Sequence, residues 1–173
     1  MEYRRETPAG NTFASKEDAA VKIRLLTVGK IRERYIAEAV ADFRTRLRRY
    51  EPFEELEVAA AFGGDPERAT REEGERIVRT LTRGEPLWLL ERTGTELSSV
   101  ELAAKLRELG HSGAPRLTIA VAGAFGASAD LVARADFCWS LSALTFLHEW
   151  ARAIVVEQLY RAAKISRNEP YHH

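Results

Sequence analysis

The chain has 173 residues, of which 45% are hydrophobic, and its 26 lysines and arginines balance 26 aspartates and glutamates. This length and composition suit one globular domain with a sizeable core and are too small for two ordinary domains. A net charge of zero excludes a broad basic field as the means of holding nucleic acid or an anionic membrane. Any nucleic-acid partner must therefore be bound through local contacts.

Cys138 is the only cysteine, so a disulfide within the chain is impossible, and its apolar neighbours predict a buried thiol rather than a reactive one. This cysteine usage fits a reducing compartment. The N-terminus lacks the apolar core of a secretory signal, and no uncharged apolar run is long enough to cross a bilayer. We therefore expect a soluble, cytoplasmic protein with no membrane contact.

The first 20 residues are polar, include Pro8 and Gly10, and show no sustained apolar period. Such a segment has little apolar surface with which to offset the entropy lost on ordering. We expect residues 1–20 to be a flexible extension and residues 21–173 to form a single domain.

Strand and helix patterns then alternate along the chain. Residues 22–28 are rich in Ile, Leu and Val, which predicts a buried strand. Apolar residues between Ile36 and Tyr50 recur every three or four positions, as on one face of a helix. Residues 53–62 alternate as a second strand, and a Gly-Gly-Asp-Pro turn starts a charged helix over 67–83. The apolar stripe of that helix is thin, so we expect much of its surface to be solvated.

The second half of the chain continues the alternation. The apolar run 86–91 predicts a strand that is covered on both faces, followed by a loop over 92–98. Two serines then cap a helix that reaches Leu109, and residues 116–123 form a fourth strand. After a brief helix, residues 137–141 predict a fifth strand.

The last helix has an apolar set that includes Trp150, Ile154 and Leu159. Alternation of strands and helices through the whole chain indicates an α/β fold, with a parallel sheet flanked by helices on both faces. Ligands in such sheets bind at the carboxyl ends of the strands.

Three strand ends combine small residues with exposed backbone: Leu90–Glu91 before Gly94, Ala122–Gly123 before Gly126, and residues 141–145. Such loops let main-chain amides approach a ligand closely, which suits an adenosine or amino-acid group. The simpler interpretation is that the glycines of AGAFG only permit a tight strand-to-helix turn. A nucleotide-binding oxidoreductase is disfavoured, because it would need GxGxxG after the first strand.

Other candidate groups have equally ordinary explanations. His148 begins the last helix and is a candidate base, although a histidine there is more often structural or solvated. The tail from Asn168 to His173 gathers phenol and imidazole groups, yet it lacks the spaced Cys, His and carboxylate set of a metal site. Arginines 44, 46, 48 and 49, with Arg161 and Lys164, would bind phosphate if the fold or a dimer brought them together; solvated helix faces are as consistent with the pattern.

The motif SLSALT...H...VVEQLYRA...I..N.PYH, which follows LTIAVAG.FG.S, resembles the RlmH family of SPOUT-class ribosomal RNA methyltransferases. The resemblance runs from Val21 to His172 and includes KIRLLTVGK at its start and LLERTG in its middle. Residues 1–20 fall outside it. A match of this length and specificity is not explained by chance.

The resemblance implies a SPOUT fold with a C-terminal trefoil knot, a homodimer and S-adenosylmethionine (S-adenosyl-L-methionine) held in the knot loops. Knots are otherwise almost absent from protein folds. The apolar surplus of the last helix would then cover the knot or meet the partner subunit. Residue by residue, the cofactor positions of the family fall on Leu90, Ala122, Gly123, Leu141, Ser142, Ala143, Leu144, Thr145 and Phe146.

The reaction that the resemblance implies is methylation of N3 of a pseudouridine in 23S rRNA of the assembled ribosome, with no metal ion. Arg161 is expected to place a phosphate or base, and Tyr171 and His172 to form the target-base pocket, with His172 as a candidate general base. The chain departs from the family at AGAFG, where a glycine, a proline and a carboxylate are replaced. That departure motivates an alternative: a non-catalytic ribosome-binding or assembly factor on the same fold.

Overall fold

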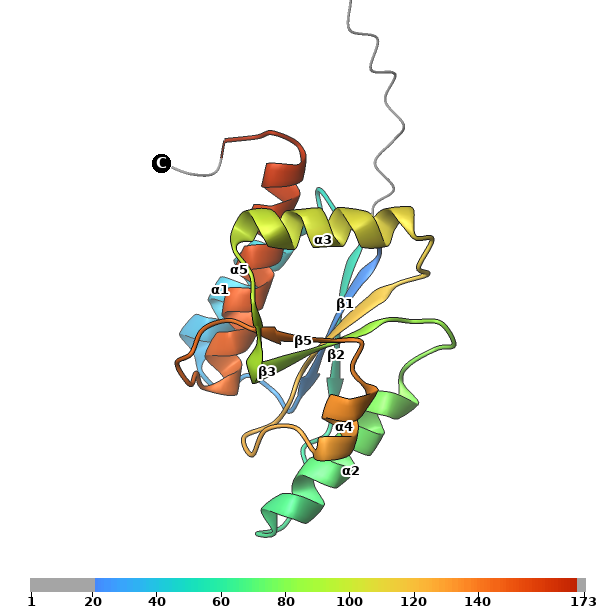
Figure 1. The fold of residues 1–173 in the computed structure, drawn as a ribbon. Helices are drawn as coiled ribbons and strands as arrows, with labels where there is room; N and C mark the ends of the chain where they lie inside the picture. The colour runs from blue at the N-terminus through green and yellow to red at the C-terminus, as the bar shows by residue number, and fades with distance from the viewer. Residues whose placement is uncertain (1–20, 171–173) are drawn as a thin grey trace, which may run out of the picture.

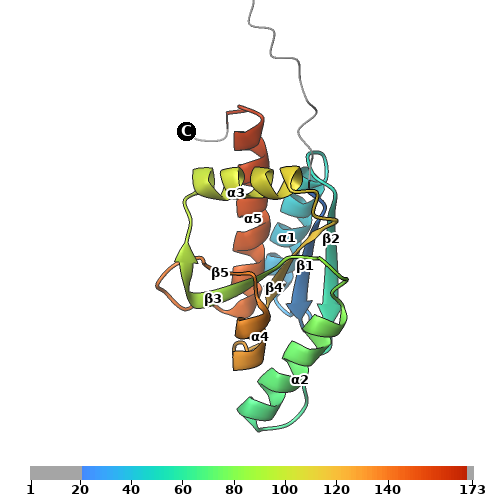
Figure 2. The same cartoon turned by 45° about the vertical axis from the view of Figure 1, so that its right-hand side comes forward.

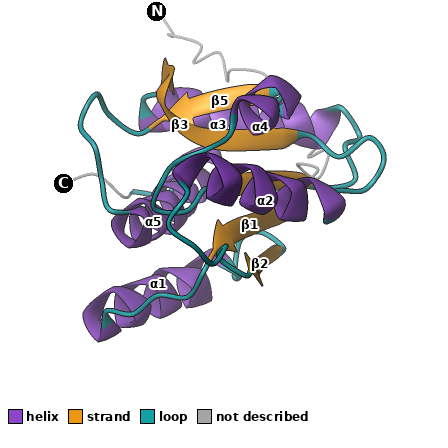
Figure 3. Cartoon of the chain, turned by 90° about the horizontal axis from the view of Figure 1, so that it is seen from below, coloured by secondary structure: helices purple, strands orange, loops and turns teal. Residues whose placement is uncertain are grey.

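Five parallel strands form one sheet in the computed structural model, which describes residues 21–170 (Figure 1). The strand order is β2-β1-β4-β3-β5, so β2 and β5 lie at opposite edges, as the end-on view shows (Figure 3). The extension predicted over residues 1–20 lies outside the described residues, as do Tyr171, His172 and His173. The strands are β1 (Ile23–Val28), β2 (Phe53–Val58), β3 (Leu87–Glu96), β4 (Leu117–Val121) and β5 (Phe137–Ser140).

Helices cover both faces of this sheet (Figures 1 and 2), which confirms the predicted α/β architecture. Three of them, α1, α3 and α5, pack against one face of the sheet and form the larger apolar core with it. The other two, α2 and α4, pack against each other and on the smaller core. The helices are α1 (Arg34–Leu47), α2 (Pro66–Arg79), α3 (Ser99–His111), α4 (Ala129–Arg134) and α5 (His148–Ser166).

The central strands β1 and β4 are buried along their whole length because both faces of the sheet are covered. In β1, Ile23 and Leu25 belong to the core beneath α1 and α5, whereas Leu26 and Val28 belong to the core beneath α2 and α4. All six residues of β1 are buried. The edge strand β2 is more polar, since only Phe53 of its six residues is buried.

The helix α5 lies between α1 and α3, which explains its surplus of apolar residues. Ala153, Val155 and Leu159 are all buried within the chain, so most of the surplus belongs to the core of this domain. Of the two expected uses of this surplus, covering the knot or meeting a partner subunit, the second therefore applies to little of it. Only Trp150, in the first turn, is clearly exposed (42%).

Two predicted elements are shorter in the structure. The strand β2 ends at Val58 rather than at Phe62, because residues 59–61 turn onto α2: the Arg76 guanidinium donates to the Ala59 carbonyl at 2.8 Å. Phe62 is left 92% exposed. The helix α2 ends at Arg79, and the carbonyl of Thr80 accepts a hydrogen bond from Arg24 in the sheet.

The strand β3 is longer than predicted, because residues 92–96 were expected to be a loop. The pairing of β3 with β5 is irregular, because Leu90 and Thr95 are both partners of Trp139. The β3 residues between them form a bulge, and the pairing with β5 resumes at Thr95. Gly94 makes this possible. A Cβ added there would collide with the backbone carbonyl of Cys138, whose carbon would be 2.6 Å away.

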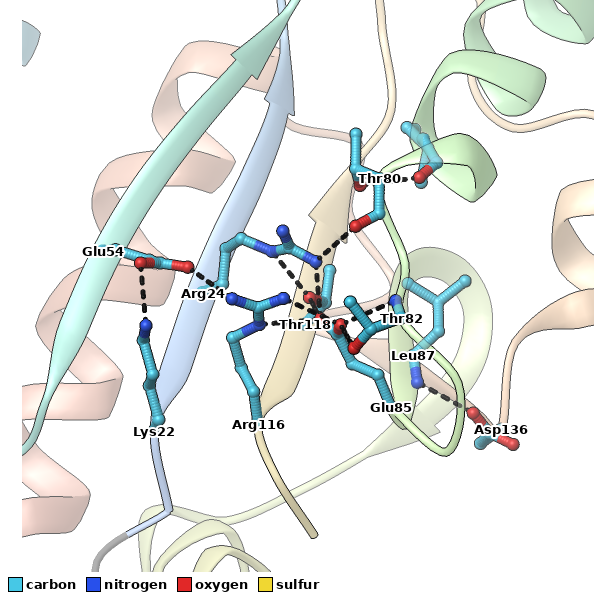
Figure 4. Close-up of polar contacts among 11 residues, drawn as sticks. Lys22, Arg24, Glu54, Thr80, Thr82, Glu85, Leu87, Arg116, Thr118 and Asp136 are labelled. Carbon is cyan, nitrogen blue, oxygen red and sulfur yellow. Dashed lines mark hydrogen bonds and ion pairs between the residues drawn. The ribbon is translucent and has the colours of Figure 1, made fainter.

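A buried polar cluster closes the amino ends of the central strands (Figure 4). The carboxylate of Glu85 accepts hydrogen bonds from Arg24 (2.6 Å) and Arg116 (2.9 Å), and also from the hydroxyl of Thr118. Burial alone would raise the pKa of Glu85, but the hydrogen bonds from Arg116, Thr118 and Thr82 hold that pKa far below its ordinary value. Every charge of the cluster is paired, so we interpret it as structural.

Candidate functional site

A pocket lies at the carboxyl ends of β3, β4 and β5, against the start of α5, where parallel α/β sheets bind ligands. It is a hollow of about 580 Å³ that is open to solvent. Of the nine residues predicted to hold the cofactor, eight line this pocket and Ala143 does not. Those eight are Leu90, Ala122, Gly123, Leu141, Ser142, Leu144, Thr145 and Phe146.

The loop from β5 to α5 forms one wall, and its own hydrogen bonds shape it. The Ser140 hydroxyl donates to the carbonyl of Ser142 at 3.1 Å, and the Leu144 amide donates to the Ser142 Oγ at 3.1 Å. This pair of bonds curls the backbone around Ser142 in a local turn. Five residues of this loop line the hollow: Leu141, Ser142, Leu144, Thr145 and Phe146.

The turn after β4 forms a second wall. The amide of Gly126 donates to the carbonyl of Gly123 at 3.0 Å, and Gly126 has a φ of +82°, a conformation that L side chains rarely adopt. Phe125, one of the three replaced residues of AGAFG, is 56% exposed, and it does not line the pocket. Of the three, Ala122 is the one that lines the pocket and that a bound ligand would meet.

Glu91 lines the pocket, as expected from its place at a candidate strand end, but three other lining residues were not predicted from the sequence: Arg92, Trp139 and Ala151. Arg92 belongs to the segment that bulges out of β3. The predicted loop after Glu91 carried no signal for a bulge of this kind. His148, which the sequence left open as a base or a structural group, also lines the pocket and is half-buried.

The first turn of α5 is tied to the loop after β1. The Glu149 Oε2 atom accepts hydrogen bonds from the amides of Arg32 (3.1 Å) and Glu33 (3.2 Å). Glu149 is 9% exposed, and its carboxylate lies at the amino end of a helix, where negative charge is favourable. This contact fixes the start of α5, and with it His148, relative to the sheet.

Arg161 lies on α5, thirteen residues beyond His148. At 1.5 Å per residue, this places it about 20 Å along the helix from the pocket. Its guanidinium pairs with Glu157 on the same helix at 2.6 Å. Within one chain, the structure therefore separates Arg161 from the predicted cofactor residues.

The segment that leads to the tail is anchored at this far end of α5 (Figure 1). The Glu169 carboxylate accepts hydrogen bonds from the Lys164 Nζ (2.5 Å) and from the Tyr50 hydroxyl (2.9 Å), and these bonds lower the pKa of Glu169. Arg167 donates to the carbonyl of Tyr50 at 2.6 Å. Tyr171 and His172, predicted to form the target-base pocket, lie just beyond the described residues.

The arginines of α1 were offered as a phosphate surface, and three of them have partners inside the protein. Arg44 pairs with Glu55 at 2.6 Å, Arg46 pairs with Asp42 at 2.8 Å, and Arg48 donates to the carbonyl of Phe53. These pairs favour the interpretation of α1 as an ordinary solvated helix face.

Cys138 is half-buried rather than fully buried, and burial raises the pKa of its thiol. A raised pKa disfavours the thiolate, so this side chain is a poor nucleophile. Within residues 21–170, no three His, Cys, Asp or Glu side chains are grouped as metal ligands. In the same range, no helix is both long and apolar enough to cross a bilayer.

Comparison with known proteins places these features in a family. A family model described as "Predicted SPOUT methyltransferase" matches residues 21–172. A protein of Pelobacter propionicus named "Ribosomal RNA large subunit methyltransferase H" is 40% identical over 153 residues, which cover 88% of this chain and 100% of that protein. Proteins of the same name from Acetivibrio thermocellus and Bifidobacterium adolescentis are 38% and 37% identical, each over 88% of this chain and 99% of the relative.

Proposed function

The chain belongs to the SPOUT methyltransferase family, and from this premise we propose that it methylates N3 of a pseudouridine in 23S rRNA of the assembled ribosome. S-adenosylmethionine is the proposed methyl donor. The observation that carries the proposal is the pocket, in which eight of the nine predicted cofactor positions converge from three strand ends. A ribosomal substrate also makes the cytoplasm the proposed location.

The lining of the pocket suits this cofactor in chemistry: small-molecule sites are mostly apolar with a few well-placed polar groups. Leu90, Leu141 and Phe146 supply apolar walls for an adenine ring, and the backbone at Gly123 and Ser142 supplies hydrogen-bonding groups beside them. The hollow is open with Ala122 in its lining, so the AGAFG sequence is compatible with binding.

When bound, the cofactor supplies an electrophilic methyl group on a sulfonium, so the protein needs no covalent nucleophile of its own. It must hold the target nitrogen in line with the methyl group and remove the imide proton. We assign the binding of the target base to Tyr171 and His172, and the acceptance of the proton to the His172 imidazole. Arg161 is proposed to contact the RNA next to that base, after exchanging its partner Glu157 for a phosphate.

These assignments require two copies of the chain. The pocket is at the start of α5, whereas Arg161 is about 20 Å along the helix and the chain reaches Pro170 beyond it. In a homodimer, the pocket of one protomer would receive the tail of its partner. Exposed apolar residues at and after the pocket support such an interface: Leu144 and Leu147 are each 69% exposed. The ring of Trp150 makes a tilted contact with the ring of Tyr35, which is 56% exposed, at 5.9 Å between ring centroids.

The trefoil knot is part of the same proposal. The chain crosses from α4, on the smaller core, through the edge strand β5 to α5, on the larger core. The β5–α5 loop and the turn after β4 both reach the same pocket along this path. Threading of the last helix through these loops would fix both walls of the cofactor site at once.

The proposed function is tested by supplying labelled S-adenosylmethionine to three substrates from cells that lack the gene: intact 70S ribosomes, isolated subunits and free rRNA. We expect label on N3 of one pseudouridine, with intact ribosomes as the best substrate. A protein that binds the ribosome but transfers no methyl group would instead be the non-catalytic assembly factor that the altered AGAFG sequence raises as the alternative.

A further inference from the structure

Glu73 is a buried carboxylate of α2 that has no part in the cofactor pocket as described above. It is 5% exposed. Its Oε1 atom accepts a hydrogen bond from the amide of Ala61 at 2.9 Å, which fastens the loop after β2 to the helix. Its Oε2 atom has no hydrogen-bond partner among residues 21–170. A buried carboxylate oxygen without a partner is costly and calls for a reason.

The unpaired Oε2 atom lies against Gly123, a residue that lines the pocket. A Cβ added at Gly123 would overlap the Oε2 atom of Glu73 and lie 3.1 Å from its Cδ. Gly123 is not among the glycines with a positive φ, so its backbone conformation does not itself demand glycine. The glycine is needed here because the carboxylate occupies the space where a side chain would begin.

Gly74, the next residue of α2, is packed closely against Ser128 and Leu131, which follow the turn after β4. A Cβ at Gly74 would lie 2.9 Å from the Oγ of Ser128 and 3.4 Å from the Cβ of Leu131. Ser128 caps α4, since its hydroxyl oxygen accepts the amide of Leu131. Glu73 and Gly74 thus lie against the first and last residues of the segment 123–128, which contains the turn that forms the second wall of the pocket.

We propose that Glu73 is a positioning residue of the methyltransferase site: its carboxylate, anchored on the Ala61 amide, supports the turn 123–126 from behind and holds the cofactor wall in its binding conformation. Loss of the side chain leaves a void behind Gly123 and a buried amide without an acceptor at Ala61. The turn then samples more conformations, and the ligand must order it at the expense of affinity.

This inference rests on the proposed function for its effect on the cofactor, and its first test does not depend on that function. We would measure hydrogen exchange of the peptide that contains residues 122–128 in the cofactor-free protein. Glu73→Ala should exchange faster there, and peptides from β1 should be unchanged. Glu73→Gln keeps an oxygen for the Ala61 amide and a group of the same size beside Gly123, so it should exchange like the wild type.

The second measurement is the dissociation constant for S-adenosylmethionine by calorimetry. Glu73→Ala should weaken binding by about three- to tenfold, which corresponds to the loss of one buried hydrogen bond. Glu73→Gln should stay within about twofold of the wild type. Glu75→Gln is the matched control, because Glu75 lies on the same helix, is half exposed and pairs with Arg79 at the surface.

Coupling between Glu73 and Gly123 separates positioning from a general loss of stability. Gly123→Ala alone should weaken binding strongly, because its methyl group and the carboxylate overlap. In the Glu73→Ala background, the same substitution should cost much less, because the overlapping group is gone. Additive effects on affinity would show that the contact between Glu73 and Gly123 does not act on cofactor binding.

Unchanged exchange of residues 122–128 in Glu73→Ala, or additive effects of the two substitutions on affinity, would overturn the inference. Failure of the proposed function would give a different experimental result. In that case the wild type itself would bind no S-adenosylmethionine, while the exchange experiment would still report whether Glu73 holds the turn.

Discussion

Replacement of Glu85 by alanine should destabilise the protein severely, although Glu85 lies far from the pocket. Glu85 is 1% exposed, and Arg24, which it neutralises, is 5% exposed. Without the carboxylate, the Arg24 guanidinium would remain buried with only the Thr80 carbonyl and the Thr118 hydroxyl as acceptors. Breaking a buried ion pair by removing one partner costs about 3 to 5 kcal/mol.

The assay is urea unfolding at pH 7, followed by circular dichroism at a fixed protein concentration. We expect the free energy of unfolding of Glu85→Ala to fall by about 3 kcal/mol or more, and that of Glu85→Gln to fall by less, because the amide keeps one acceptor. Glu75→Ala is the control, since its salt bridge with Arg79 is on the surface. A loss below about 0.5 kcal/mol for Glu85→Ala, which is typical of surface sites, would refute the argument.

The same cluster predicts how stability depends on pH. The pKa of Glu85 is depressed in the folded protein, so its contribution is fully present above its unfolded pKa of about 4.3 and is lost as the pH falls toward the folded value. The difference in unfolding free energy between the wild type and Glu85→Gln should therefore be constant from pH 7 to about pH 5 and shrink below pH 4. A difference that grows on acidification would contradict the assignment of the charged form.

Three further substitutions test the site. Gly94→Ala should lower the free energy of unfolding by about 1 to 3 kcal/mol and weaken cofactor binding, because the methyl group collides with the Cys138 carbonyl; normal stability would disprove the close packing at the bulge. Glu149→Ala should lower the free energy of unfolding by about 1 to 3 kcal/mol, because it leaves the Arg32 and Glu33 amides without their acceptor. Faster hydrogen exchange of residues 30–35 would locate the effect, and unchanged exchange there would contradict it. Leu147→Asp should shift the protein from dimer to monomer in analytical ultracentrifugation without lowering the melting temperature of the monomer, and an unchanged sedimentation coefficient would place the interface elsewhere.

The sequence contained most of the fold because the burial pattern of each element is local. The run from Leu87 to Leu90 is apolar on both faces, and the stripe from Ile36 to Leu47 has helical spacing, so both patterns predict the right element. The residues at which elements end were harder to predict. The end of β2 depends on Arg76, which binds the carbonyl of Ala59 from a different element, and no local pattern encodes such a contact.

The candidate site was predictable where it depended on strand ends and not where it depended on packing. The small residues after β4 and β5 marked two walls of the pocket from the sequence. The bulge that brings Arg92 into the pocket depends on Gly94 approaching β5, and the support behind Gly123 depends on Glu73, about 50 residues earlier in the chain. Glycine in a strand and a glutamate in a charged helix are both too common for either contact to be inferred without the fold.

Binding of S-adenosylmethionine to the purified protein is the most direct test of the account, because the eight converging residues are assigned to that ligand. Calorimetric titration should give one site per chain, and Ser142→Trp, which places an indole in the hollow, should abolish the heat of binding while the protein remains folded. A wild-type protein that gives no binding heat, or a Ser142→Trp variant that binds as tightly as the wild type, would contradict the assignment of this pocket.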